Sequence, residues 1–248
     1  MEEKPSIGQV WKMYKMGGIT PAITSMFNVR TAQQMAFIRN IAKEQRSHDI
    51  MHVPLKDVEY VVFDLETTGF SPYHGDEIIS IGAVKMTGSR IWKNETFYSV
   101  VNPKRPISRE IEELTGITNG MAEAAPDLIH SLEKFFAFVG KSILVAHGTG
   151  HDKHFLNSAL WRTSRVNLTH RILDTMFFER WLNPKRQSIT LDALIDAYEI
   201  EKLERHHALE DARMTAQLWA YQLEELMNQD MIYLSDLYER VSSYRPNV

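Results

Sequence analysis

The chain has 248 residues, of which 44% are hydrophobic and 24% are charged, so extensive disorder and fibrous repeats are excluded. It contains no cysteine, which excludes disulfides, cysteine-bound zinc, iron–sulfur clusters and a thiol nucleophile, so any metal must be bound by Asp, Glu or His. No stretch approaches the ~18 consecutive apolar residues of a membrane helix, and the N-terminus lacks a signal-peptide pattern, so we expect a cytoplasmic protein with no membrane partner.

The first 56 residues differ from the remainder in charge. They carry eight Lys or Arg against four acids, so the formal net charge of −4 divides into +4 for this segment and −8 for the rest. Between Val10 and Arg46 the sequence predicts short helices, broken at Gly17-Gly18 and at Pro21. We expect residues 1–56 to form a basic helical extension that could contact phosphates or dock a protein partner, although a solvated helix face would carry the same charges.

Strands are expected after Pro54. Three segments rich in β-branched and aromatic residues are separated by turn residues and predict an antiparallel meander: residues 60–66, 78–86 and 97–101. Beyond Pro103 the pattern becomes helical, with an apolar face on residues 128–139. An apolar strand is expected next, at residues 143–146.

Helices and strands alternate over the C-terminal half. Helical periodicity predicts five helices, at residues 152–163, 175–182, 190–198, 207–227 and 232–244. A short strand is expected at 171–173. Because hairpins favour antiparallel pairing and crossover connections favour parallel pairing, this order predicts an α/β fold with a mixed sheet flanked by helices. Three tryptophans fit the helix faces and are expected in the core: Trp161, Trp181 and Trp219.

Two acidic residues lie at the end of the first expected strand. Because side chains alternate along a strand, the apolar odd-numbered residues share one face, whereas Asp64 and Glu66 emerge together on the other. The two acids directly precede Thr67-Thr68-Gly69, at the carboxyl end of the strand, where sheets of this kind commonly open onto ligands. A strand end that runs into solvent would show the same pair.

Two further acids come from separate segments. Asp152 begins a predicted helix and shares its inward-facing apolar stripe, and Asp211 borders the buried side of the helix at 207–227. Helix capping would also favour acids near these positions. Four acids that converged would repel one another and raise one another's pKa values unless cations neutralised them. Hard carboxylate ligands of this kind suit Mg²⁺ or Mn²⁺.

The segments that contain these acids resemble the motifs of a known protein family. They are Phe63 to Gly69, Val145 to Leu156 and His206 to Ala212, with further matches at Leu114 to Thr118, Ala125-Pro126, Asp174-Thr175 and Leu191 to Leu194. Together they resemble the three motifs of the DEDDh (DnaQ-like) family of 3′-5′ exonucleases, which includes the epsilon proofreading subunit of DNA polymerase III and RNase T. The resemblance runs from about Tyr60 to Met227 and leaves the basic extension unexplained.

The resemblance implies an RNase H-like fold with a two-metal mechanism. It implies that the four acids hold two Mg²⁺ or Mn²⁺ ions, that His206 is the general base, and that four residues contact the substrate: Thr67, Thr68, Gly69 and His147. The implied reaction releases nucleoside 5′-monophosphates from the 3′ end of nucleic acid. Single-stranded DNA is favoured over RNA because proofreading relatives dominate the resemblance, and a proofreading role would need a separate polymerase subunit.

The resemblance also implies a division of the chain. We expect a basic extension at 1–56, an exonuclease domain at 57–227 and a C-terminal helical tail at 228–248. The second motif departs from the family, since Gly148 replaces the usual Asn and His151 the usual Phe, which affects the placement of the terminal nucleotide. His207 stands where family members often carry Arg, so the choice of His206 as the base depends on alignment to Asp211.

Two alternatives remain at this point. The spacing of His147, His151 and His154 would suit a zinc site if one regular helix carried them, but the glycines between the first two argue against such a helix. The other alternative is a catalytically silent module of the same fold that binds nucleic acid or protein. It is disfavoured because all four acids and the histidine are present.

Overall fold

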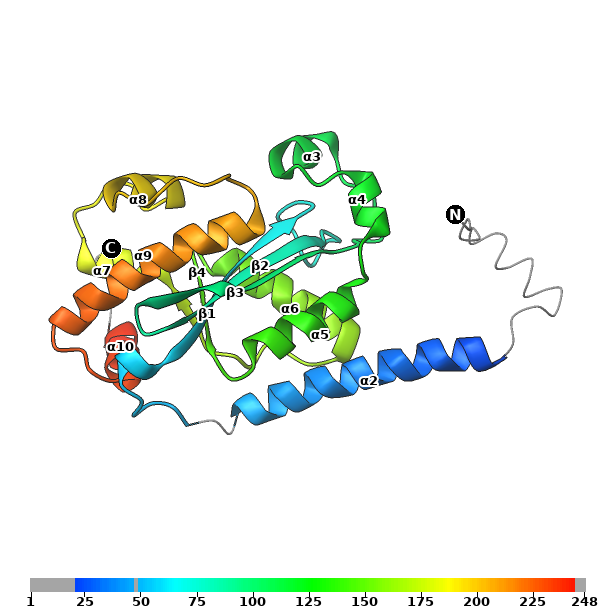
Figure 1. Ribbon diagram of the computed structural model, residues 1–248, viewed down its shortest axis with the longest axis horizontal. Coiled ribbons are helices and arrows are strands. Elements are labelled where there is room, and N and C mark those ends of the chain that lie inside the picture. Colours follow the sequence, from blue (N-terminus) through cyan, green and yellow to red (C-terminus); the bar gives the residue numbers. More distant parts are fainter. Residues whose placement is uncertain (1–20, 47–48, 244–248) are drawn as a thin grey trace.

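A mixed β-sheet forms the centre of the protein, as seen in the computed structural model, which describes residues 21–46 and 49–243 (Figure 1). The five strands are β1 (Glu59–Thr67), β2 (Ile78–Thr87), β3 (Arg90–Val100), β4 (Ile143–Ala146) and β5 (Ile172–Asp174), in the order β3-β2-β1-β4-β5. Strand β1 pairs antiparallel with β2 and parallel with β4, so the expected mixed sheet is confirmed.

Strand β3 is longer than the sequence predicts. It begins at Arg90 instead of residue 97, and its pairing with β2 continues to the turn, where Thr87 lies opposite Arg90. The missed part contains Lys93, Asn94 and Glu95, which are exposed and lack the β-branched pattern of a buried strand. Strand pairing at the sheet edge therefore extends beyond what side-chain composition indicates.

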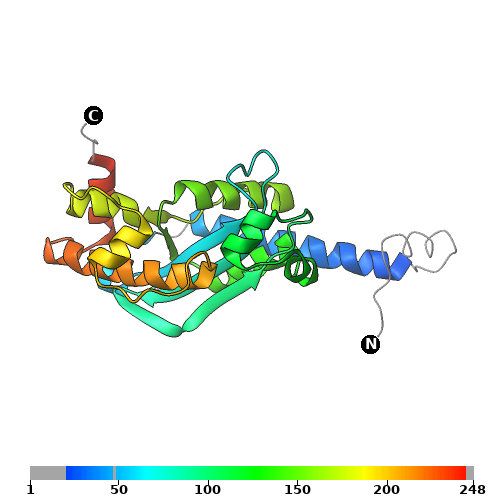
Figure 2. The ribbon, with the colours of Figure 1, turned by 90° about the horizontal axis from the view of Figure 1, so that it is seen from above.

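Helices cover both faces of the sheet (Figures 1 and 2). On one face lie α2 (Pro21–Arg46), α5 (Leu128–Val139) and α6 (Gly150–Ser164), and on the other lie α7 (Thr175–Leu182), α9 (Ala208–Asn228) and α10 (Leu234–Ser243). The short helices are η1 (Leu55–Asp57), α3 (Arg109–Thr115), α4 (Asn119–Ala124) and α8 (Leu191–Ala197). The helices expected after residue 128 are present with nearly the expected bounds; residue 244, the expected end of the last one, lies outside the described residues.

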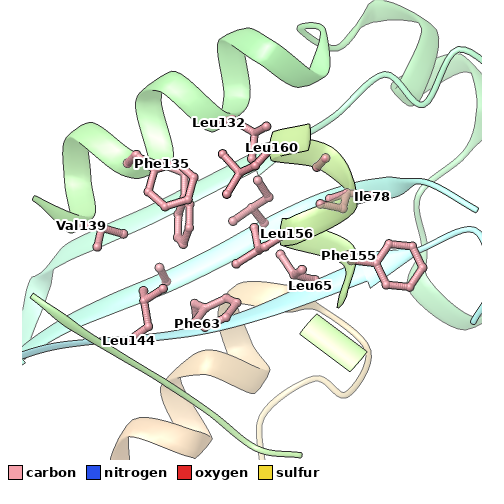
Figure 3. Packing of buried hydrophobic residues seen from close by; sticks show 14 of the residues in the cluster. Phe63, Leu65, Ile78, Leu132, Phe135, Val139, Leu144, Phe155, Leu156 and Leu160 are labelled. Atoms are coloured by element: carbon pink, nitrogen blue, oxygen red, sulfur yellow. The ribbon is translucent and has the colours of Figure 1, made fainter. Parts of the chain in front are cut away.

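The alternation of side chains along β1 divides the core into two layers. Phe63 and Leu65 pack against α5 and α6, in a cluster that includes Phe135 and Leu156 (Figure 3). Tyr60 and Val62 face the other way, in a second cluster with residues of α7, α9 and α10. Because Asp64 and Glu66 share the face of Tyr60 and Val62, they point toward the side of the sheet that α9 covers.

Helix α2 is longer than the short helices that the sequence predicts for the extension. It is a single helix of 26 residues that begins at Pro21, because proline is tolerated in the first turn of a helix. The predicted break at Gly17-Gly18 lies outside the described residues. Ile38 is buried in the core cluster with α5 and α6, and Arg39 Nε donates to the Ser164 carbonyl oxygen at 2.9 Å. The C-terminal part of this helix therefore packs on the rest of the chain, while its first turns extend beyond the body (Figure 2).

The tryptophans divide between core and surface. Trp219 is fully buried and Trp181 packs partly buried against the same cluster, but the expectation for Trp161 is wrong, since 52% of its surface is exposed. It lies on the outer side of α6, where the guanidinium of Arg165 lies 5.8 Å from its ring centre. None of the helices that the structure describes has the length and hydropathy needed to cross a bilayer.

Candidate active site

A cavity of about 490 Å³ opens at the carboxyl end of β1. Asp64 and Glu66 line it from β1, and His206 and Asp211 line it from the start of α9. Asp152, in the first turn of α6, does not line the cavity and is buried, with 4% of its surface exposed. The fold therefore brings the acids of three separate segments to one end of the sheet.

Gly82 allows α9 to reach this position. It lies opposite Asp64 in the pairing of β1 with β2, and the start of α9 crosses directly over it. A Cβ atom at Gly82 would lie 2.2 Å from the carbonyl carbon of Ala208, a distance that no side chain tolerates. The absence of a side chain at Gly82 thus sets the height of Asp211 above β1.

The turn before α9 places a histidine beside two of the acids. His206 adopts a left-handed backbone conformation with φ of 61°, and its N–H donates to Asp211 Oδ2 at 2.9 Å. One side-chain ligand atom from each of Glu66, His206 and Asp211 lies within 4.8 Å of the others, the one such group of three found among residues 21–46 and 49–243. Two carboxylates and an imidazole are a donor set that divalent metal ions accept.

Neighbouring His207 has a different environment. Its ring stacks on Tyr98 with the ring centres 4.6 Å apart, and it occupies the position before the first residue of α9. It does not line the cavity. The structure therefore separates the two adjacent histidines, with His206 directed to the acids and His207 to β3.

The acids resist ionising together. Burial, together with the charges of Asp174 and Glu66, raises the pKa of Asp152 to about 8. Burial also raises the pKa of Glu66 to about 7, with a further contribution from Asp211. The pKa of Asp64 is raised well above its ordinary value by burial and then by the charges of Asp152, Glu66 and Asp211. A cluster of this kind is short of positive charge, so it fits divalent cations.

Asp174 holds the turn that leads into α6. Its carboxylate accepts hydrogen bonds from the N–H groups of Gly148 at 3.0 Å and Thr149 at 2.9 Å. Gly148 has φ of +76°, a conformation that favours glycine, which accounts for glycine at a position where the family usually has Asn. His147, in the same turn, lines the cavity and is fixed by a 2.8 Å hydrogen bond between Nδ1 and the Thr175 hydroxyl.

The loop after β1 contributes to the cavity unevenly. Thr67 and Gly69 line it, but Thr68 does not, because its hydroxyl donates to Asp76 Oδ1 at 3.0 Å and accepts from the Glu77 N–H. Phe70 lines the cavity with 87% of its surface exposed. An exposed aromatic ring beside a polar cavity is suited to stacking on a base.

The three histidines of the second motif do not converge. His147 bonds Thr175, His151 Nε2 lies 3.3 Å from the Thr67 hydroxyl, and His154 Nδ1 lies 3.3 Å from the Tyr73 hydroxyl. No described residues other than Glu66, His206 and Asp211 bring three ligand atoms together. The arrangement gives no support to the histidine zinc site.

Several residues of the cavity wall were not predicted as site residues from the sequence. They are Phe70, Ile111, Leu114, Met176, Asp192 and Arg205. Arg205 Nε donates to Asp192 Oδ1 at 2.7 Å, and its Nη1 contacts Asp211 Oδ1. The position of Arg205, directly before the two histidines, was the available signal, but its pairing with Asp192 depends on how α8 and α9 meet.

Comparisons with known proteins agree with this geometry. An exonuclease family model matches residues 61–219. The PolC-type DNA polymerase III of Caldanaerobacter subterraneus subsp. tengcongensis is 41% identical over 170 residues, which cover 68% of this chain and 12% of that protein. The chain thus spans about an eighth of the length of the PolC-type relatives that it matches.

Solved structures of similar fold include two nucleases. Exonuclease X in complex with 5′ overhanging duplex DNA has a TM-score of 0.56 and 23% identity, covering 67% of this chain and 92% of that one. The nuclease domain of 3′hExo, a DEDDh family member, bound to rAMP, has a TM-score of 0.60 and 20% identity, covering 68% of this chain and 93% of that one.

Proposed function

This chain belongs to the exonuclease family as a DnaQ-like 3′-5′ exonuclease, and from that premise we propose that it removes nucleoside 5′-monophosphates from the 3′ end of single-stranded DNA by two-metal-ion hydrolysis. The observation that carries this proposal is the meeting of Asp64, Glu66, Asp211 and His206 around one cavity, with Asp152 buried beside them.

The four acids would hold two Mg²⁺ or Mn²⁺ ions. When bound, such ions supply an activated water and stabilise the charge that develops on the scissile phosphate. Asp64, Glu66 and Asp211 would bind from the cavity wall and Asp152 from the buried side. Their raised pKa values support the assignment, because carboxylates that destabilise one another are stabilised when cations occupy the space between them.

His206 would act as the general base. One of its ring nitrogens lies within 4.8 Å of a carboxylate oxygen of Glu66 and of Asp211, so a water held by those acids would lie beside the imidazole. Histidine readily accepts a proton at neutral pH, and a positioned base of this kind contributes about 10²- to 10⁴-fold to a rate. The hydrogen bond from the His206 N–H to the Asp211 carboxylate fixes the position of the proposed base relative to this acid.

The cavity would receive the 3′-terminal nucleotide. Its volume of about 490 Å³ lies in the range of sites for small ligands, and Phe70 and Leu114 offer apolar surface to a base. The sugar or phosphate would be contacted by Thr67, Gly69 and His147. Thr68 would not contact the substrate, but its hydrogen bond to Asp76 would stabilise the loop that carries Thr67 and Gly69. DNA is proposed over RNA because the PolC-type relatives are DNA polymerases.

The segments outside the matched region would support this activity. We propose residues 1–56 as a basic extension that contacts nucleic acid or a polymerase, 57–227 as the exonuclease domain and 228–248 as a tail; Leu234 and Leu237 of that tail are buried in the second core cluster. A cytoplasmic location remains a prediction. If the extension contacts phosphates, the full-length variant with Lys4→Gln, Lys12→Gln and Lys15→Gln will lose activity less steeply between about 50 and 200 mM salt than the wild type. Equal salt slopes would contradict that role.

The test is degradation of matched 5′-labelled single-stranded DNA and RNA oligomers in Mg²⁺, Mn²⁺ or EDTA. We expect a metal-dependent ladder that shortens from the 3′ end, is abolished by Asp152→Ala and is slowed about 10²-fold or more by His206→Ala. His207→Ala is the matched control and should retain activity within a few fold. Intact oligomers under all conditions would favour the silent-module alternative, and faster shortening of RNA would overturn the choice of DNA.

A further inference from the structure

Among the described residues that line the cavity, Arg205 is the one Lys or Arg side chain. Its Nε donates to Asp192 Oδ1 at 2.7 Å and its Nη1 contacts Asp211 Oδ1. Asp192 is largely exposed at the cavity rim, whereas Asp211 is buried. The guanidinium therefore spans from a solvent-accessible carboxylate to a carboxylate of the proposed metal site.

Arg205 opposes the mutual repulsion of the buried acids. Burial raises the pKa of Asp211, and the charge of Arg205 acts in the opposite direction. The same guanidinium also lowers the pKa of Asp64 and Glu66 against the effect of burial. Arg205 is thus a counter-charge to three of the acids, Asp64, Glu66 and Asp211.

The two oxygens of Asp211 have partners of different kinds. Oδ2 accepts from the backbone N–H of His206, a donor that the turn before α9 fixes in place. Oδ1 contacts Nη1 of Arg205, which lies at the end of a long and partly exposed side chain. A cation bound at Oδ1 would meet the like charge of the guanidinium, so one of the two must leave, and the side chain is the part that can move.

We propose that Arg205 is the resident counter-cation of the metal-free site, and that it releases Asp211 to an incoming divalent ion while Asp192 retains it at the cavity rim. This inference rests on the proposed two-metal function. Its consequence is competition: metal binding costs the Arg205–Asp211 contact, so the affinity for metal is lower than the acids alone would give.

The experiment is calorimetric titration of the metal-free full chain with Mn²⁺, together with thermal unfolding in EDTA. Removing the competing contact in Arg205→Gln should tighten Mn²⁺ binding about 3- to 10-fold and lower the unfolding temperature in EDTA. Asp192→Asn leaves the Arg205–Asp211 contact in place and removes the carboxylate that retains the displaced guanidinium, so its Mn²⁺ binding should stay equal or weaken. Arg213→Gln is the matched control, because Arg213 pairs with Glu210 beside Asp211 on α9 and does not line the cavity; we expect its Mn²⁺ affinity to stay within about 2-fold.

The outcomes separate the two proposals. Unchanged or weaker Mn²⁺ binding by Arg205→Gln, or equal tightening by Arg213→Gln, would overturn the role of Arg205 and leave the exonuclease mechanism intact. If the wild-type chain binds no Mn²⁺, the two-metal function fails, and the role of Arg205 fails with it.

Discussion

The fold buries carboxylates in two places, and the two differ in how their oxygens are satisfied. Glu179 of α7 is fully buried, and its two oxygens accept four hydrogen bonds, from Arg186 at 2.5 Å, Asn183 at 3.0 Å, Tyr198 at 2.9 Å and Gln222 at 3.0 Å. At the cavity, one guanidinium, that of Arg205, acts on three acids, Asp64, Glu66 and Asp211, and buried Asp152 lies beside them.

The difference distinguishes a structural carboxylate from a functional one. Two of the donors, Arg186 and Asn183, come from the segment between α7 and α8, and the others come from the residue after α8 (Tyr198) and from α9 (Gln222). Glu179 therefore links these parts of the fold, and its oxygens are satisfied by protein donors. The cavity acids have raised pKa values because protein donors do not compensate their burial. Buried acids without sufficient protein partners are the proposed site of the divalent cations.

The largest effect is expected from Asp64→Asn. The change removes one proposed metal ligand. It should cost little free energy of unfolding, because the buried carboxylate is already unfavourable in the metal-free protein. Activity on single-stranded DNA should fall by about 10³-fold or more, while the free energy of unfolding in EDTA should stay equal or rise. Kinetics and chemical denaturation measure the two effects, and a marked loss of stability would show that Asp64 is structural like Glu179.

The same kind of change at Glu179 should give the opposite result. Glu179→Gln leaves Arg186 without its partner charge and disturbs three further hydrogen bonds, so we expect a loss of about 2 to 4 kcal/mol in the free energy of unfolding. Below the unfolding temperature, the turnover rate should remain within a few fold of wild type. A variant that is stable but inactive would contradict the division between the two regions.

Gly82→Ala should affect the cavity without touching any acid. The new methyl group would press on the backbone of Ala208 and lift the start of α9, and with it His206 and Asp211. Displacement of catalytic groups by about 1 Å can cost ~10²-fold in rate, and overpacking costs about 1 to 3 kcal/mol in stability. Gly120→Ala is the control, since a Cβ there would lie 3.9 Å from its nearest neighbour. Wild-type rates for Gly82→Ala would contradict this role of Gly82.

The smallest effect is a pH dependence of stability without metal. Asp152, with a pKa of about 8, and Glu66, with a pKa of about 7, keep protons in the folded state that the unfolded chain releases near pH 4. Their contribution to stability is therefore present below about pH 4 and is lost as pH rises to about 8. In EDTA, wild type should lose more of its free energy of unfolding than Asp152→Asn across this interval. Parallel denaturation profiles for the two proteins would contradict the raised pKa of Asp152.

The sequence by itself determined the strands and helices whose patterns are local. Alternation along β1 separates Asp64 and Glu66 from the apolar face, and the stripe on α6 turns Asp152 inward, because both periodicities follow from backbone geometry. The order of the motifs indicated the exonuclease family that the matched region confirms. The same patterns misplaced Trp161 and the start of β3, since exposure and edge pairing depend on neighbours distant in sequence.

Only the tertiary structure decided how the cavity is assembled. Three contacts join residues that no local sequence pattern relates. Helix α9 crosses closely over Gly82, and Asp174 accepts hydrogen bonds from the turn before Asp152. Arg205 contacts both Asp192 and Asp211. The same holds for Glu179, which is an unremarkable acid in the sequence and the most completely bonded one in the core. A buried acid becomes structural or functional according to the donors that packing brings to it, and packing is a property of the whole chain.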